Sequence, residues 1–206
     1  MPYFLRYPDI IFKLTLQHLY LVLIALSIAL IIALPLAWFL NRHKRLSNIV
    51  MGFFGIVYTI PSIALMIILI PFLGLNEKSV IVALVLYSQV ILLRNILTGL
   101  DGIPKTTIEA ANGMGLSTWQ IAWKIQLPLA LPVILAGVRI SAVVVVAIAT
   151  IGAKFGAGGL GTLLFDGIAQ AGRTDKIWTG AIIVGLVAFS LSRLALYLEK
   201  RFSYPV

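Results

Sequence analysis

Long uninterrupted apolar runs constrain this chain more than any other feature of its sequence. A helix needs about 20 mostly apolar residues to cross the hydrocarbon core of a bilayer. Five stretches reach that length, namely Leu19–Leu40, Ile49–Leu73, Val80–Leu100, Pro132–Gly152 and Ile177–Leu198. Backbone amides in hydrocarbon must bond within their own segment, so each stretch is predicted to be helical, with local kinks at Pro35, Pro61 and Pro71. We therefore expect an all-α integral membrane protein with five transmembrane helices, forming a single domain over residues 1–206.

The composition supports lipid as the main solvent of the chain. Of its 206 residues, 61% are hydrophobic and 11% are charged, whereas a soluble domain carries roughly 25% charged residues. The net charge of +9 does not indicate nucleic-acid binding, because the basic residues are scattered or lie at the ends of apolar runs. The absence of cysteine excludes disulfides and thiolate sites. Only His18 and His43 are available as histidines, too few and too far apart for a metal cluster.

Basic residues at the ends of the runs predict the orientation. The loop 41–48 carries Arg42, Lys44 and Arg45 and no acid, so we expect it to be cytoplasmic. The N-terminus then lies outside and the C-terminus inside, with the segment 101–131 also inside. Because this basic cluster follows the first apolar run instead of preceding it, the N-terminus does not resemble a cleavable signal peptide, and we expect the first helix to be retained.

The segment Asp101–Leu131 is the long, mixed-polarity stretch on the predicted inner side. Thr106 with Glu109, and Ser117 with Gln120, have the spacing of capping boxes. This spacing predicts two short helices, Thr107–Asn112 and Thr118–Gln126, joined by a turn at Gly113 and Gly115, with the second helix ended by Pro128. The residues alone leave two interpretations open. The hairpin either connects two spans and does nothing more, or it presents the small face at Ala110 and Ala111 to another protein.

A spaced pattern in this segment is specific to one family. The pattern is Glu-Ala-Ala, three residues, Gly, nine residues, Ile, one residue and Leu-Pro, and it matches at Glu109, Ala110, Ala111, Gly115, Ile125, Leu127 and Pro128. The segment thereby resembles the coupling loop of bacterial binding-protein-dependent ABC importer permeases, which implies a type I ABC importer permease fold. This resemblance implies that a cytoplasmic ATPase is contacted by Glu109, Ala110, Ala111 and Gly115. It also implies that Leu127 and Pro128 turn the chain back into the membrane.

Further segments resemble the subgroup of these permeases that imports glycine betaine, carnitine or choline. They are Tyr58–Leu65, Arg94–Asn95, Leu127–Ile134 and Gly156–Gly161. The resemblance implies a multi-pass protein of the bacterial cytoplasmic (inner) membrane. It also implies a second permease protomer, identical or homologous, two cytoplasmic ATP-binding subunits that hold ATP and Mg, and a separate extracytoplasmic solute-binding protein. Methionine or another amino acid is the alternative solute, because methionine importer permeases share the coupling loop.

The sequence offers no set of residues for catalysis. The seven acids fall mostly in loops, and no G-x-x-x-x-G-K-[ST] motif is present, so the chain is expected to be a non-catalytic subunit without a cofactor of its own. The rival class is an ion-coupled carrier or channel. Such a protein predicts paired intramembrane carboxylates or inverted repeats, and neither is found.

Quaternary ammonium solutes are recognised through aromatic faces. The candidates for the passage wall are the polar or aromatic residues of spans two and three, namely Tyr58, Thr59, Ser62, Tyr87, Gln89 and Asn95. Hydrogen bonds between helices are the alternative role for each of them.

Gly156, Gly158, Gly159 and Gly161 form a literal G-x-G-x-x-G. A dinucleotide site is rejected because no strand–helix alternation surrounds the motif and no acid lies near the required offset. We expect instead a flexible turn at an outer gate, followed by a short helix over Thr162–Ala169. A plain loop that uses glycine for tight turns is the alternative.

Two arginines lie within the predicted spans. Arg94 and Arg139 are each expected near the cytoplasmic end of a helix, where a charge needs a partner, water or an interface. They either snorkel to the inner headgroups or pair with Asp101 or Glu109.

Overall fold

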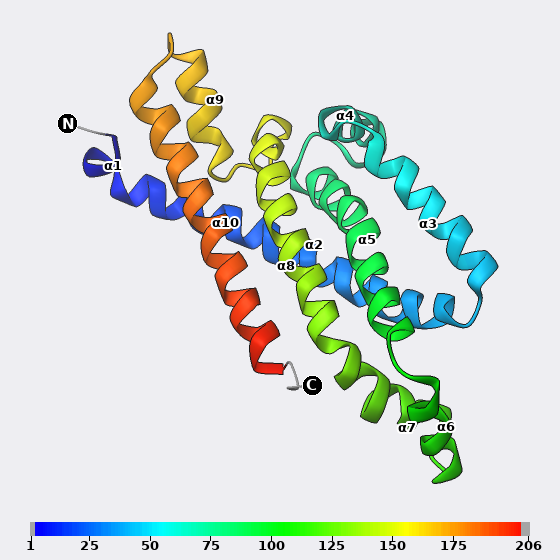
Figure 1. The fold of residues 1–206 in the computed structure, drawn as a ribbon. Helices are drawn as coiled ribbons and strands as arrows, with labels where there is room; N and C mark the ends of the chain where they lie inside the picture. The colour runs from blue at the N-terminus through cyan, green and yellow to red at the C-terminus, as the bar shows by residue number, and fades with distance from the viewer. Residues whose placement is uncertain (1–2, 203–206) are drawn as a thin grey trace.

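The computed structural model describes residues 3–202, and these form helices and turns without any strand (Figure 1). The helices are α1 (Tyr3–Arg6), α2 (Pro8–Asn41), α3 (Lys44–Thr59), α4 (Ser62–Leu73), α5 (Glu77–Asp101), α6 (Lys105–Gly113), α7 (Thr118–Ile121), α8 (Leu127–Gly152), α9 (Gly161–Ala169) and α10 (Thr174–Phe202). A π-helical turn over Ala122–Gln126 joins α7 to α8, and a 3-10 turn over Ala153–Phe155 follows α8.

Within residues 3–202, four helices are long and apolar enough to cross a membrane. They are α2, α5, α10 and the continuous helix Thr118–Phe155. A fifth span is counted if α3 and α4, which are bent by 101° relative to each other, are taken together. The all-helical fold class is therefore confirmed, with four to five candidate spans.

Helices α5 and α8 form the centre of the bundle. They pack against each other and against α2, while α10 lies on α8 (Figure 1). In the most apolar 18-residue stretch of α5, 67% is buried inside the protomer, whereas in the corresponding stretch of α10 only 11% is buried. The outer helices thus leave most of their apolar surface for lipid or for another chain, in keeping with a membrane as the surrounding solvent.

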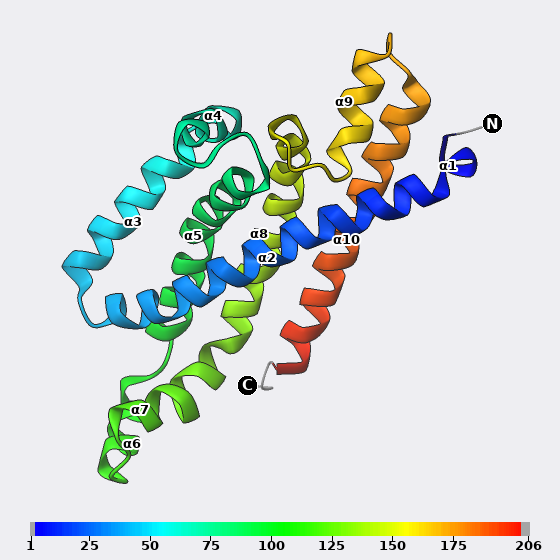
Figure 2. The ribbon, with the colours of Figure 1, turned by 180° about the vertical axis from the view of Figure 1, so that it is seen from behind.

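Helix α2 crosses α5 and α8 obliquely (Figures 1 and 2). Ala25, Ala29, Ala33 and Ala37 recur every fourth residue along it, and all four are fully buried. Residues at this spacing share one face of a helix, and small side chains there let helix backbones approach closely. The helix begins at Pro8, well before the predicted start at Leu19.

The second predicted span is broken at Pro61. Ile60 has extended angles (φ −67°, ψ 129°), and Pro61 follows with φ −55° and ψ 136°. Proline disfavours the helical region for the residue before it and supplies no N–H of its own. The predicted kink is therefore a full break between α3 and α4. Pro35 and Pro71, in contrast, lie inside α2 and α4.

The connection from α8 to α9 is a close-packed glycine joint. Gly158 and Gly159 have φ of +71° and +80°, in the left-handed region that favours glycine. Gly161 begins α9 so close to α8 that an added Cβ would lie 1.9 Å from the carbonyl oxygen of Thr150. That oxygen belongs to the backbone and cannot move aside.

We predict that Gly161→Ala destabilises the protein by about 1–3 kcal/mol, the usual cost of overpacking a tight contact. Thermal unfolding of the purified protein in detergent measures the effect. Gly185→Ala on α10 is the matched control, because an added Cβ there meets nothing within 4 Å. Equal melting temperatures for the two variants would contradict the close packing of the joint.

Candidate functional site

Helices α6 and α7 project from one end of the bundle, beyond the ends of α5 and α8 (Figures 1 and 2). On α6, Glu109 and Ala110 are exposed, whereas Ala111 is fully buried within the hairpin. The described part of the chain gives Glu109 no salt bridge. The hairpin therefore presents a carboxylate and a small side chain to whatever lies beyond this end of the bundle.

The turn of the hairpin is a Schellman motif. The Leu116 N–H donates to the Ala111 carbonyl at 3.2 Å, and the Gly115 N–H donates to the Asn112 carbonyl at 2.9 Å. This pattern requires a left-handed residue after the helix, and Gly115 supplies it with φ +76°. No atom lies within 4 Å of a Cβ built at Gly115. The glycine is needed for its backbone angles and not for space.

One of the two predicted capping boxes is present. The Gln120 N–H donates to the Ser117 hydroxyl at 3.3 Å, and the Gln120 side-chain oxygen accepts from the Ser117 N–H at 2.8 Å. The box predicted at Thr106 and Glu109 was wrong. Helix α6 begins at Lys105 after Pro104, without a side-chain cap. The proline's fixed φ already starts the helix before Thr106, so Thr106 is not the capping residue.

Pro128 does not end the second hairpin helix, contrary to the prediction. The chain runs as one helix from Thr118 to Phe155, through the π-helical turn at Ala122–Gln126 and through Pro128. In a regular helix the ring of Pro128 would clash with the carbonyl of the residue four positions earlier, Lys124. The wider turn around that carbonyl relieves the clash. Ile125 lies in this turn, and Leu127 and Pro128 open α8.

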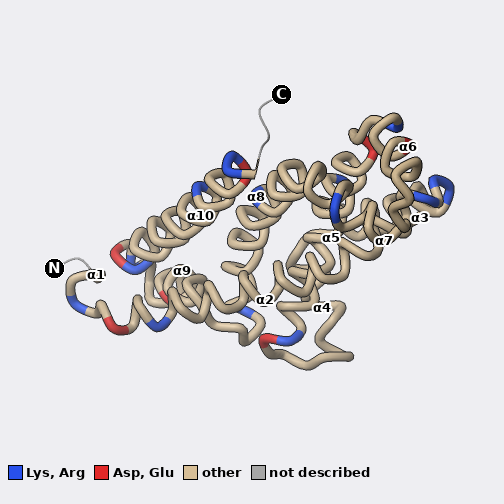
Figure 3. Tube along the Cα trace, turned by 90° about the horizontal axis from the view of Figure 1, so that it is seen from below, with Lys and Arg blue, Asp and Glu red and all other residues tan. Residues whose placement is uncertain are grey.

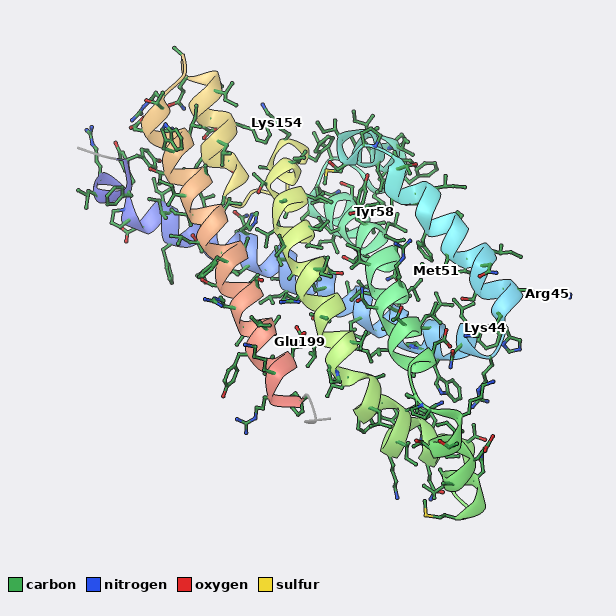
Figure 4. All side chains as sticks on the ribbon, in the orientation of Figure 1. Lys44, Arg45, Met51, Tyr58, Lys154 and Glu199 are labelled. Atoms are coloured by element: carbon green, nitrogen blue, oxygen red, sulfur yellow. The ribbon has the colours of Figure 1, made fainter. Side chains whose placement is uncertain are left out.

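Four of the six passage candidates gather at the break between α3 and α4. Tyr58, labelled in Figure 4, and Thr59 end α3. Ser62 begins α4, and Tyr87 approaches from α5. The rings of Tyr58 and Tyr87 meet edge to face with centroids 5.8 Å apart. The Tyr87 hydroxyl donates to the carbonyl of Ile60, which the break leaves without a helical partner. Tyr87 is buried, and Tyr58 is 41% exposed.

The other two candidates lie between helices. Gln89 is 1% exposed, and its amide nitrogen donates to the Ala29 carbonyl of α2 at 3.1 Å. Asn95 bonds to the Ile91 carbonyl at 2.8 Å and packs against Gly137 of α8, where an added Cβ would lie 2.6 Å from the Asn95 Cβ. Gln89 makes the hydrogen bond between helices that was the alternative role, whereas Asn95 bonds within α5 and packs against α8.

The glycines expected at an outer gate lie at the end of the bundle opposite the hairpin (Figure 1). The Gly159 N–H donates to the side-chain oxygen of Gln17 at 3.1 Å, and His18 packs on the same glycine. Sequence reasoning missed Gln17 and His18. Two polar residues directly before a long apolar run were the available signal, because such groups need a partner once buried.

The charges near the hairpin pair differently from the prediction. Arg139 of α8 pairs with Glu199 of α10 at 3.5 Å, and Asp101 pairs with Lys44 at 2.5 Å (Figure 4). Arg94 is exposed. Pairing of the arginines with Asp101 or Glu109 was therefore wrong. Lys44 begins α3, next to the end of α5, and its amino group already pairs with the Asp101 carboxylate.

Most other charged residues lie at turns and helix ends (Figure 3). Within residues 3–202, no group of three or more potential metal-binding side chains is found. The assembled features are a multi-span apolar bundle, a hairpin projecting from one end, and polar helix breaks at the other. They define a membrane-embedded helical bundle that presents a hairpin at one end and a polar helix break at the other.

Comparison with known proteins gives the family. Residues 25–204 match the family of binding-protein-dependent transport system inner membrane components, and the chain belongs to this family. It is thus a non-catalytic permease subunit of an ABC importer in the inner membrane, and ATP is hydrolysed in separate subunits.

Curated relatives match over most of their length. The carnitine transport permease protein OpuCB of Listeria monocytogenes is 39% identical over 87% of this chain and 84% of its own. The glycine betaine/carnitine/choline transport system permease protein OpuCB of Bacillus subtilis is 36% identical over 90% and 85%. The osmoprotectant import permease protein OsmW of Salmonella typhimurium is 39% identical over 88% and 86%.

Solved structures share the fold. The inward-facing MetNI methionine ABC transporter superposes with a TM-score of 0.86 at 22% identity, covering 94% of this chain and 96% of the other. An amino acid ABC transporter superposes with a TM-score of 0.75 at 16% identity, covering 96% of both chains. The expected type I ABC importer permease fold is thereby confirmed.

We predict that Gly115→Ala weakens association with the partner ATPase, because a Cβ in the left-handed region costs roughly 1–2 kcal/mol and favours another shape of the turn. The amount of ATPase co-purified per permease measures the effect. Gly113→Ala is the matched control: it lies in the same hairpin, also in open space, but does not have a positive φ. If both variants retain wild-type amounts of ATPase, the turn geometry does not matter for docking.

Proposed function

We propose that this chain is the transmembrane subunit of an ATP-driven importer for quaternary-ammonium osmoprotectants such as glycine betaine, carnitine and choline. The observation that carries the proposal is the 36–39% identity, over more than four-fifths of both chains, to permeases named for these solutes. Methionine or another amino acid is the alternative solute. The structural likeness to methionine and amino acid transporters is below 25% identity and supports the shared fold alone.

The functional unit is proposed to contain two permease protomers, identical or homologous. One bundle of four to five spans is too small to enclose a solute pathway between its own helices. The break between α3 and α4 also leaves large apolar side chains uncovered, among them Ile56 at 69%, Ile67 at 53% and Phe72 at 81% exposure. The whole described chain acts as one domain of this assembly, with a separate solute-binding protein outside and two ATP-binding subunits inside.

Coupling is proposed to run through the hairpin. Glu109, Ala110, Ala111 and Gly115 contact the ATPase, which holds ATP and Mg. Closure of two ATPases moves the hairpins toward each other and rocks the helices between inward-open and outward-open states. The continuous helix Thr118–Phe155 supports this step, because it joins α7 to α8 without a break in the helix. The glycine joint at Gly156–Gly161 then forms part of the outer gate.

The passage wall is proposed to lie at the α3–α4 break. Tyr58, Thr59, Ser62 and Tyr87 bring two aromatic rings and four hydroxyls together, with no carboxylate among them. A quaternary ammonium group cannot donate hydrogen bonds, and it is attracted to aromatic faces. Tyr58 is the exposed member of the ring pair, so its face is the one available to a solute.

We predict that Tyr58→Leu lowers ATP-dependent uptake of glycine betaine by about 3- to 30-fold, the range for losing one cation–π contact. Uptake is measured with the complete transporter, including its binding protein, in proteoliposomes. Tyr20→Leu, at an exposed position on α2, is the matched control and should retain wild-type uptake.

The same assay separates the solutes. Excess carnitine or choline should compete with glycine betaine, and excess methionine should not. Uptake of methionine without uptake of any quaternary ammonium solute would overturn the proposed solute class and leave the family assignment intact.

We predict that the α2–α3 turn is cytoplasmic and the α9–α10 turn extracytoplasmic, with the N-terminus outside and the C-terminus inside. The chain has no cysteine, so His43→Cys and Gln170→Cys each introduce a single exposed thiol, one per turn. A membrane-impermeant maleimide should label the Gln170→Cys variant in intact cells and the His43→Cys variant only after lysis. The reverse pattern would invert the topology and place the hairpin outside.

A further inference from the structure

A cavity of about 410 Å³ lies between α2, α5 and the helix that carries the hairpin. Its walls include Pro35 and Trp38 of α2 and Leu100 of α5. The continuous helix Thr118–Phe155, called the hairpin helix below, contributes Trp119, Trp123 and Gln126. The volume falls within the roughly 300–1,000 Å³ typical of small-molecule sites. The cavity is distinct from the α3–α4 break, because none of the four residues proposed for the passage wall lines it.

The lining is almost entirely apolar. Its polar groups largely satisfy one another, since the Trp38 indole N–H donates to the Gln126 side-chain oxygen at 3.4 Å. Ordered water needs two to four polar partners, and an apolar cavity offers none. The rings of Trp119 and Trp123 meet edge to face at 5.3 Å and are 63% and 53% exposed. The site therefore suits an apolar chain in contact with tryptophan.

A cation stands at the edge of this lining. The Arg42 guanidinium lies over the Trp38 ring, 4.3 Å from its centroid. Arg42 is exposed, and the described residues provide it with no salt bridge, whereas its neighbour Lys44 is held by Asp101. An occupant with a hydrocarbon tail and a phosphate would match both the cavity and the cation.

We infer that this cavity binds an anionic phospholipid of the cytoplasmic leaflet, with an acyl chain against Trp38 and Trp123 and the phosphate at Arg42. Tryptophan is enriched at the level of lipid headgroups, and basic residues beside a span attract anionic lipid. The inference rests on the proposed function only for the side of the membrane on which Arg42 lies. A lipid bound here contacts the hairpin helix, so its presence would affect the position of the hairpin relative to the bundle.

Two variants test the two halves of the site in the assembled transporter. Ala122→Phe fills the cavity from a buried lining position, and Arg42→Gln removes the cation. The matched controls are Ile140→Phe, at an exposed apolar position of α8 outside the cavity, and Arg201→Gln at the end of α10. Native mass spectrometry counts the phosphatidylglycerol and phosphatidylcholine that survive detergent washing.

We expect Arg42→Gln to lower retained phosphatidylglycerol about fivefold relative to phosphatidylcholine, and Ala122→Phe to lower both lipids. Wild-type retention in both variants would overturn the site. Equal loss of the two lipids in Arg42→Gln would overturn its selectivity for an anionic headgroup. A cavity filled by an ATPase side chain would retain no lipid in the wild-type complex, which also overturns the proposal. Cysteine labelling at position 43 reports the membrane side separately, so a failed lipid site and a failed topology are distinguishable.

Discussion

The rest of the structure depends on the π-helical turn at Ala122–Gln126. Pro128 follows it closely, and in a regular helix its ring would clash with the carbonyl of Lys124, yet the wider turn accommodates the proline, and a single helix continues from Thr118 to Phe155. Because α8 packs against α2, α5 and α10, this helix links the projecting hairpin mechanically to the centre of the bundle. A helix ended at Pro128 would instead have given the hairpin a hinge of its own.

Two irregular backbone segments lie at the end of the bundle opposite the hairpin (Figure 1). One is the break between α3 and α4, and the other is the glycine joint between α8 and α9. Each is held by a side chain from a neighbouring helix: the Tyr87 hydroxyl bonds to the Ile60 carbonyl, and Gln17 accepts from the Gly159 N–H. Non-helical backbone at membrane depth is tolerated where protein or a water-filled cavity satisfies its polar groups. Both segments meet that condition through named contacts.

The sequence predicted several features that depend on neighbours along the chain, although the capping box expected at Thr106 and Glu109 is absent because Pro104 already starts α6. Apolar run length gave the helical class, and the Ser117–Gln120 spacing gave a capping box that the structure contains. Features that depend on competition between distant groups were not predictable. Asp101 bonds to Lys44, 57 positions away, so its carboxylate is not available to pair with Arg139. The sharp bend at Pro61 and the passage through Pro128 also differ from the prediction, the first for a tertiary reason and the second for a local one. Tyr87 from α5 stabilises the break at Pro61, whereas the π-helical turn removes the need for a break at Pro128.

Burial reduces the set of candidate residues for the passage wall further than residue chemistry does. If the pathway opens between two protomers, its wall must be accessible in the isolated protomer or become so by a small motion. Gln89 fails this condition, because it is 1% exposed and bonds across to α2. Exposing it would separate α2 from α5 along the fully buried alanine face of α2. Tyr58 meets the condition, since it is 41% exposed beside a helix break whose carbonyl is already bonded to Tyr87. Gln89 is thus committed to holding α5 against α2, whereas the exposed ring of Tyr58 remains the candidate for contact with a solute.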